Sequence, residues 1–222
     1  EISAFVQGSL SQQGFKRIDY FNYLDSDPAR ETDLQNISGG NIKGGLNWNI
    51  DENHNVFGNA GYYSKQPFFD SVFQNFRNDI NPDPRNEKVI GMEIGYGYTN
   101  QKFRANLNLY RTSWKDRFIS VSSDFDVNNT PDDPTDDEQG NADINGVEQL
   151  HLGAELDMTY DITDKLRLLG MISAADWGYA GNPSGVAFDQ NADAIGSITL
   201  DLDDKKVGDA AQFTARIGLD LD

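Results

Sequence analysis

Residues 88–98 read KVIGMEIGYGY, and this stretch decides the fold. One alternate phase carries Ile90, Met92, Ile94, Tyr96 and Tyr98, whereas the other carries Val89, Gly91, Glu93, Gly95 and Gly97. Only an extended strand separates two such phases, because successive side chains of a strand point to opposite faces. The stretch therefore predicts a β-strand with one apolar face and one face of small or polar residues.

The same alternation recurs in other segments of similar length. Apolar residues fill every second position in four further ladders, at 42–50, 103–109, 150–160 and 213–221. Further strands are predicted at 2–21, kinked at Gly14, from Val56 onward, and at 166–177, where both phases are apolar. A tilted strand needs about nine to eleven residues to cross the core of a bilayer. The sequence thus predicts about eight membrane-spanning strands.

Short and long connections alternate between these strands. The short ones, rich in Asn and Asp, are 51–55, 99–102 and 162–165; the long ones are about 24–39, 65–87, 122–146 and 178–209. Asn and Asp favour tight hairpin turns, and a compact soluble domain seldom has four such long loops. The pattern predicts an all-β fold, an antiparallel transmembrane β-barrel wall with turns at one rim and extracellular loops at the other.

The size of the barrel follows from its polar phase. Eight strands can close alone, but so small a barrel is filled by its own inward side chains. Glycine at Gly91, Gly95, Gly97 and Gly153 would leave it hollow, so an arc of a wider barrel fits better. The chain also opens directly on a strand and ends inside the ladder 213–221. We therefore expect residues 1–222 to be one partial barrel domain, a fragment of a longer protein.

Composition excludes several classes of function. The formal net charge is −18 in 222 residues, cysteine is absent, and no apolar run is long enough for a membrane helix. Such acidity argues against nucleic acid as a partner, because phosphate binding needs clustered basic residues. No serine stands in a nucleophile elbow, and no glycine-rich string has the context of a phosphate cradle. We expect neither enzymatic activity nor a cofactor.

Several longer strings carry a family resemblance. They are 55–69 (NVFGNAGYYSKQPFF), 86–98, 106–114, 146–155 and 207–214. In this order and spacing they resemble the C-terminal barrel portion of TonB-dependent outer-membrane receptors, in the form typical of Bacteroidota, over essentially the whole chain. The resemblance implies a barrel of about 22 strands with a plugged lumen. The plug, the TonB-contacting box and the closing strand are not found in this chain.

The resemblance also implies a location and partners. Such a receptor lies in the outer membrane of a Gram-negative bacterium, surrounded by lipid. TonB acts on it through the plug domain, a surface lipoprotein sometimes lids it, and it imports a nutrient ligand such as a glycan, a peptide or an iron chelate. The ligand class is left open by the sequence.

The polar phase supplies an expected inner wall. Its members are Glu93, Arg104, Asn106, Asn108, Glu155, Asp157 and Arg216. Polar side chains there would keep the ligand path hydrated, while closed strand pairing satisfies the backbone inside lipid. Tyr98 and Tyr160, beside the short turns, fit an interfacial aromatic belt.

Aromatic residues near the long loops are candidates for ligand contact. We name Phe68, Phe69 and Phe73, which lie beyond the strand alternation, together with Trp114, which follows a strand. Packing within the loop is the simpler interpretation of the three phenylalanines, and ligand contact stays open as the alternative.

A calcium site is the weaker hypothesis for the acidic loop. Its candidate ligands are Asp132, Asp133, Asp136 and Asp137, and residues 141–146 resemble the opening of a calcium loop. The bidentate acid expected near position twelve is missing, because Leu152 stands there. A solvated acidic loop is the simpler interpretation, and we expect no metal. His54 and His151 are too few and too separated for a catalytic or metal cluster.

Alternation alone leaves two rival architectures. The first is a soluble β-sandwich carbohydrate-binding module, in which a second sheet replaces lipid. The second is a complete small outer-membrane barrel with an adhesive or structural role. The sandwich would stay folded and monomeric without detergent, and the small barrel would show heat-modifiable migration as an isolated chain.

Overall fold

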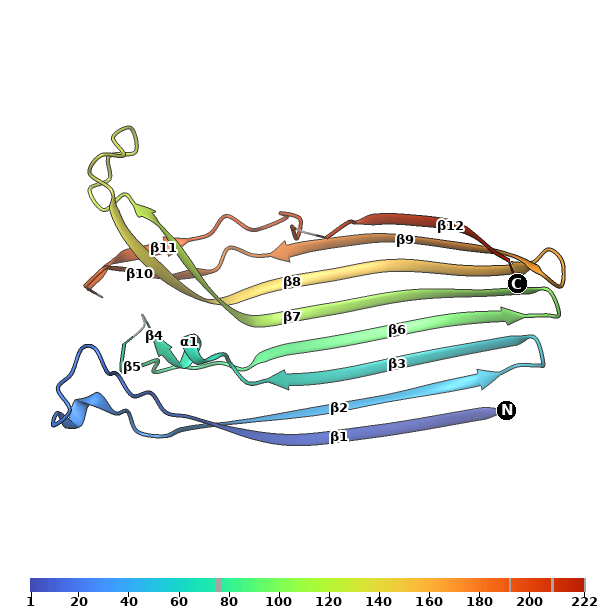
Figure 1. Ribbon diagram of the computed structural model, residues 1–222, viewed down its shortest axis with the longest axis horizontal. Helices are drawn as coiled ribbons and strands as arrows, with labels where there is room; N and C mark the ends of the chain where they lie inside the picture. The colour runs from blue at the N-terminus through green and yellow to red at the C-terminus, as the bar shows by residue number, and fades with distance from the viewer. Residues whose placement is uncertain (75–76, 192, 209, 222) are drawn as a thin grey trace.

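The computed structural model describes residues 1–74, 77–191, 193–208 and 210–221, and its main feature is one antiparallel sheet of ten strands (Figure 1). Eight long strands follow one another across it in chain order: β1 (Ile2–Phe15), β2 (Gln35–Asn49), β3 (His54–Lys65), β6 (Glu87–Thr99), β7 (Phe103–Phe125), β8 (Glu138–Asp161), β9 (Leu166–Ala180) and β12 (Phe213–Leu221). We call these the spanning wall. The expected all-β antiparallel fold and the number of long strands are confirmed.

The short connections are tight because one side chain closes each of them. Asp51 Oδ1 accepts the backbone N–H groups of Asn53 and His54, at 2.8 and 2.9 Å. Asn100 Oδ1 likewise accepts the backbone N–H groups of Lys102 and Phe103. The Thr163 hydroxyl oxygen accepts those of Lys165 and Leu166. These side chains replace the missing ladder bonds, as Asx and ST turns do. We call this end of the sheet the turn rim and the opposite end the loop rim.

The long connections differ from the expected ranges. The first covers 16–34 rather than 24–39, because Phe15 already pairs with Gln35. The second, 66–86, agrees within one residue with the expected 65–87. The third covers only 126–137 instead of 122–146, because β7 and β8 remain paired as far as Phe125 and Glu138. The fourth, 181–212, contains a hairpin of β10 (Ser184–Asp189) and β11 (Ala194–Thr199).

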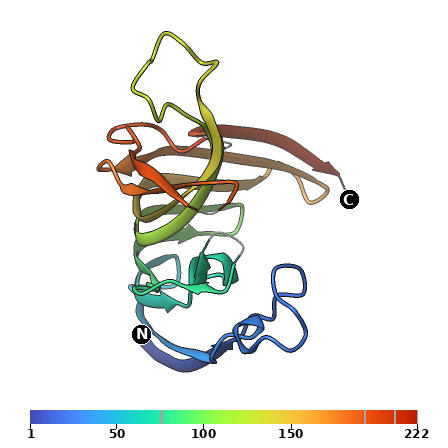
Figure 2. The ribbon, with the colours of Figure 1, turned by 90° about the vertical axis from the view of Figure 1, so that its left-hand side faces the viewer.

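The two phases of the wall form two different faces. Ile94, Leu109 and Ile217, on the apolar phase, are 56%, 47% and 80% exposed, and no second sheet covers them within the described residues. This exposure excludes a β-sandwich for the described wall, because the apolar inner faces of a sandwich are packed against each other. The sheet is curved, with β1 and β12 at its two open edges (Figure 2). The eight strands therefore do not close into a complete small barrel.

Neighbouring side chains occupy the space beside most glycines of the polar phase. The ring of Phe57 occupies the space that a Cβ at Gly95 would need, and Tyr110 does the same at Gly153. Side chains converge in this way on the inside of a curved sheet, so we call the polar phase the concave face and the apolar phase the convex face. Side chains of adjacent strands thus fill the space at Gly95, Gly97 and Gly153, against our expectation of a hollow there, whereas at Gly91 the nearest atom, Thr112 Oγ1, is 3.9 Å away.

Buried apolar side chains lie only at the loop rim among the described residues. The first loop module joins 16–34 with 66–86 and includes the 3-10 helix Pro28–Arg30, α1 (Phe69–Val72), β4 (Phe73–Gln74) and β5 (Asp79–Ile80); its core is Phe15, Val72 and Phe73, with Ile37 packed against it. The second loop module joins 117–147 with 181–202 around Ala142, Ile144, Val147 and Ala187. None of the described helices is long and apolar enough to cross a membrane.

Candidate functional site

Strand register places all seven expected inner-wall residues on the concave face. Asn106 pairs with Gly97 on one side and Asp157 on the other, and Asn108 with Gly95 and Glu155. Glu93 lies opposite Tyr110, Arg104 opposite Thr159, and Arg216 opposite Met171. Because these pairs cross five strands, they form one continuous polar strip along the inside of the curve.

The strip carries charges that the described residues leave largely unpaired. Arg104 is 3.9 Å from Asp161, and the Asn59 amide donates to Glu93 Oε2 at 3.5 Å. Glu155, Asp157 and Arg216 form no ion pair with any described residue. A shallow hollow of about 550 Å³ opens on this face, and its polar lining includes Lys43, Asn59, Tyr63, Glu93, Tyr110 and Thr112. The concave face therefore offers both signs of charge to whatever fills it.

Trp114 belongs to an aromatic stack near the loop rim of the concave face. The His151 ring stacks on Trp177, with centroids 5.1 Å apart and planes 18° apart, and lies 6.4 Å from the ring of Trp114. The Trp177 indole donates to the Tyr110 hydroxyl at 3.0 Å, and the Arg117 guanidinium lies 5.6 Å from the ring of Trp114. Sequence analysis assigned His151 no role, because the stack forms only when three strands align.

The loop phenylalanines separate into exposed and buried members. Phe68 is 63% exposed, with the Lys65 ammonium 4.1 Å from its ring centroid. Phe69 is 39% exposed and its ring lies tilted against that of Phe73, with centroids 4.9 Å apart, whereas Phe73 itself is 1% exposed in the core of the first loop module. Loop packing thus accounts for Phe73, and only Phe68 and Phe69 present surface to solvent.

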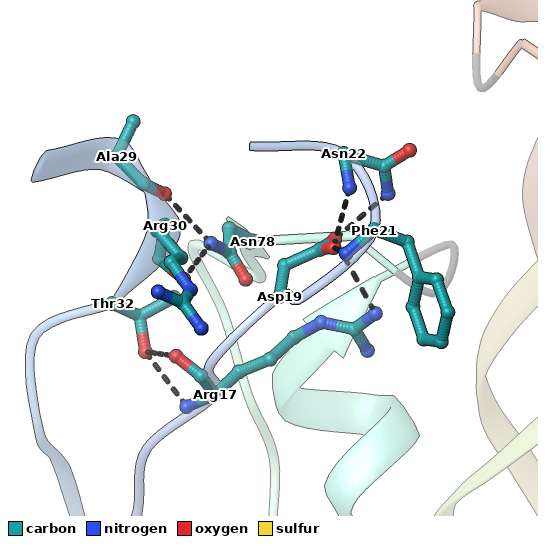
Figure 3. A network of polar contacts seen from close by, with 8 residues as sticks. All are labelled: Arg17, Asp19, Phe21, Asn22, Ala29, Arg30, Thr32 and Asn78. Atoms are coloured by element: carbon teal, nitrogen blue, oxygen red, sulfur yellow. Dashed lines mark hydrogen bonds and ion pairs between the residues drawn. The ribbon is translucent and has the colours of Figure 1, made fainter. Parts of the chain in front are cut away.

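An exposed apolar tip in the first loop module was missed by sequence analysis. Its members are Tyr20, Phe21 and Leu24, which are 66%, 96% and 77% exposed. Asp19, which is buried, shapes this tip by accepting the backbone N–H groups of Phe21 and Asn22, each at 2.9 Å, and the Asn22 amide at 2.8 Å (Figure 3). These bonds, with Arg17 nearby, lower the pKa of the Asp19 carboxyl to about 2.

A second contact fixes the tip to its neighbouring loop. The Asn78 amide donates to the carbonyl oxygens of Ala29 and Arg30, at 2.7 and 2.9 Å, across the two connections of the first loop module (Figure 3). The Arg30 guanidinium also lies 4.5 Å from the centroid of the Tyr20 ring. The tip is therefore held in place before any ligand arrives.

The acidic loop does not assemble a cation site. Asp136 accepts the Thr130 hydroxyl at 2.8 Å, and Asp133 accepts that of Thr135. Burial, followed by the charges of Asp126 and Asp136, raises the pKa of Asp137. Across the described residues, no three acidic or histidine side chains form a group able to hold a metal ion.

The calcium-like string 141–146 has a different structure from a calcium loop. It lies within β8, where Asn141 and Asp143 pair with strands on both sides. Alternate residues of a strand share a face but lie about 6.6 Å apart along a straight line, so Asn141 and Asp143 do not curl around one ion as the ligands of a calcium loop do. The resemblance to a calcium loop is wrong for this reason.

Comparisons with known proteins agree with this geometry. The family model described as "TonB dependent receptor-like, beta-barrel" matches residues 15–222. Among solved structures, the chain resembles "Copper transporter OprC" with a TM-score of 0.55 and 14% identity, over 97% of this chain and 36% of that chain. The chain thus spans little more than a third of that transporter, and no curated protein matches it. The match over 15–222 shows that this chain belongs to the TonB-dependent receptor β-barrel family.

Proposed function

We propose that the chain forms part of the barrel wall of a TonB-dependent transporter that imports a nutrient ligand across the outer membrane of a Gram-negative bacterium. One observation carries the proposal: eight consecutive strands of spanning length expose apolar side chains on the convex face and a polar strip on the concave face. Lipid on one side and a hydrated path on the other explain both faces at once.

The inner wall has a distinct role in this proposal. The strip of Glu93, Arg104, Asn106, Asn108, Glu155, Asp157 and Arg216 faces a plug domain and the passing ligand. Its unpaired charges support this role, because charges left unpaired on a polar wall are free to bind polar partners.

Ligand contact belongs to the loop rim, which we place outside the cell. The exposed rings of Phe68 and Phe69, the stack that includes Trp114, and the tip of Tyr20 and Phe21 form our candidate contact set. Exposed aromatic groups on an ordered support lose little entropy on binding. We leave Phe73 out of the set because it is buried.

Energy and further partners come from outside this chain. TonB acts through a plug domain, and a surface lipoprotein is a possible lid in receptors of the Bacteroidota form that the sequence resembles. The copper of the similar transporter is not carried over, because at 14% identity the two chains share only the fold. A glycan, a peptide or an iron chelate is the proposed ligand class.

The test uses the full-length receptor in its own cells. Strains with the receptor gene intact, deleted, or carrying Phe21→Ala with Phe68→Ala are grown on single glycans, peptides or iron chelates, with and without TonB. We expect one nutrient whose use requires both the receptor and TonB, and weaker use in the double variant. Equal growth of the intact and deleted strains on every nutrient, or absence of the protein from the outer-membrane fraction, would overturn the proposal.

A further inference from the structure

The second loop module ends in a strand with an open edge. Its sheet extends from β7 through β8 and β10 to β11, and β11 pairs with no described strand except β10 (Figure 1). The strand is anchored, because Ile195 and Ile198 pack against the core that contains Ala142 and Ile144. The backbone of β11 is therefore held extended although only one of its two edges has a partner among the described residues.

Strand register shows which backbone groups of β11 point away from β10. The Leu200 N–H donates to the Pro183 carbonyl oxygen at 2.9 Å, so these two positions form a hydrogen-bonded pair. Such pairs alternate along an antiparallel ladder with pairs that exchange no bond, and Ser197 and Thr199 belong to the second kind. The N–H and C=O groups of Ser197 and Thr199 therefore point outward, and no described residue forms a hydrogen bond with them.

The side chains of β11 do not protect this edge. Natural edge strands are commonly guarded by charged residues or by proline, whereas β11 reads AIGSIT and has neither. Gly196, Ser197 and Thr199 are all exposed. An accessible edge of this kind binds an extended polypeptide as an added strand, through main-chain hydrogen bonds. The geometry of β11 thus fits a peptide in extended conformation.

The surroundings of β11 carry negative charge. No basic residue occurs from 181 to 204 or from 118 to 146, the segments that supply the strands of this module beyond the wall. The acidic residues that flank β11 are Asp189, Asp193, Asp201, Asp203 and Asp204. Lys205 lies 3.2 Å from Asp201, but Asp193 forms no ion pair with any described residue. The edge therefore attracts a strand with positive charge at its ends.

The same charges disfavour a second copy of this chain at the edge. Two copies of β11 paired antiparallel about Ser197 would place Asp193 of each copy opposite Asp201 of the other. Like charges that face each other across a strand pair are destabilising. A basic peptide meets no such opposition.

We propose that the open edge of β11 binds an extended basic peptide as an added strand, which makes a peptide the imported ligand. Main-chain bonds to Ser197 and Thr199 hold the peptide, and basic residues at its ends contact the acidic groups beside β11. Because main-chain bonds do not depend on side-chain identity, the edge selects peptides by extended shape and charge rather than by sequence. The inference rests on the proposed function, which places the loop rim outside the cell.

The experiment measures peptide binding to the full-length receptor in detergent. The probe is a fluorescent peptide of about nine residues, enough to cover β11, with alternating valine and threonine in the middle and lysines at both ends. Fluorescence anisotropy gives its dissociation constant. We expect about tenfold weaker binding by Ser197→Pro, which removes one outward N–H and spares the bonds to β10. The matched control, Ser197→Ala, keeps that N–H and should bind as wild type does.

Two altered probes test the same edge on the unchanged receptor. N-methylation of every central residue removes the N–H donors of the peptide on both of its edges. Glutamates in place of the lysines keep the main chain and reverse the charge. We expect each altered probe to bind at least about tenfold more weakly than the original. These probes decide the question even if Ser197→Pro does not assemble.

Several results would overturn the inference. They are absence of binding of the lysine probe, equal binding by wild type and Ser197→Pro, and equal binding of either altered probe. A disulfide between two Ser197→Cys receptors would place a second copy at the edge instead. A receptor that takes up a glycan or an iron chelate with TonB and does not bind the probe loses only this inference. Probe binding at β11 by a receptor whose deletion leaves growth unchanged would remove only the proposed transport.

Discussion

The spanning wall and the loop modules are stabilised by different interactions. All buried apolar side chains of the described residues lie in or next to the two loop modules, such as Phe73 at 1% and Ile144 at 0% exposure. Elsewhere in the wall, away from the loop-rim ends of β1 and β8, the described residues include none, and the large convex residues are exposed. In the proposed barrel the wall therefore depends on hydrocarbon and on its backbone ladder, whereas the modules carry apolar cores of their own.

This difference explains how a surface made of loops can be ordered. A connection of this length without a core remains flexible and pays an entropic cost when it binds. The first loop module avoids that cost through its small core and the bonds of Asp19 and Asn78. Under the proposed function, ordered binding surfaces outside the membrane and a thin wall inside it can thus coexist in one sheet.

The largest expected effect comes from emptying the core of the first loop module. Phe73→Ala should cost about 3–5 kcal/mol of local stability, because a fully buried ring leaves a cavity. Hydrogen exchange should rise across 16–34 and the described part of 66–86, with β7 and β8 unchanged. Phe68→Ala is the control, since Phe68 is 63% exposed. Equal exchange in both variants would show that this core does not hold the loops.

Placing a charge on the convex face should have the next largest effect. Ile94→Arg is expected to cost ~2–4 kcal/mol if Ile94 lies near the bilayer midplane, and Leu156→Arg should behave alike. Glu93→Arg, one residue away on the concave face, should be tolerated. The fraction of receptor with heat-modifiable migration measures the difference. Full assembly of Ile94→Arg would contradict our assignment of the two faces.

A smaller effect is expected from acid on the loop tip. The folded pKa of Asp19, about 2, lies below the ordinary value of about 3.9. Its contribution to stability is therefore complete above about pH 4 and is lost as the pH falls toward 2. The amide resonances of Phe21 and Asn22 should shift only within that window, and Asp19→Asn should remove the transition. A midpoint near pH 4 would show that the bonds to Asp19 do not persist in solution.

The smallest effect on stability is expected at the tip itself. Phe21→Ala should change the free energy of unfolding by less than about 0.5 kcal/mol, because the side chain is 96% exposed. Thermal unfolding of the detergent-solubilised receptor measures this change. Any loss of nutrient uptake would then arise from lost contact with the ligand. A clear loss of stability would show that Phe21 packs against a part of the receptor outside this chain.

Local signals in the sequence predicted the wall well. The period-two ladders gave the eight strands and the two faces, and Asp51, Asn100 and Thr163 stand in turns that were expected from their composition. The predicted loop boundaries were wrong where strand pairing continued beyond the length needed to span a bilayer, as in β7 and β8. That extension depends on contacts such as Ile144 against β10 and β11, which no single segment reveals.

The site was predicted in part for the same reason. All seven residues expected on the inner wall share the concave face, because side-chain direction follows from strand period alone; that this face lines a lumen stays a prediction. The burial of Phe73, the stacking of His151 on Trp177 and the buried Asp19 were not foreseen, since each depends on segments distant in the chain.

The sequence by itself determined which residues form strands, which face each side chain takes and where the tight turns lie, because these properties arise from neighbouring residues. Only the tertiary structure decided which loops share a core, which aromatic rings stack and which charges find a partner. Those outcomes depend on strand register and on the meeting of distant loops, so Lys88 is paired while Arg111, of the same charge on the next strand, finds no partner among the described residues.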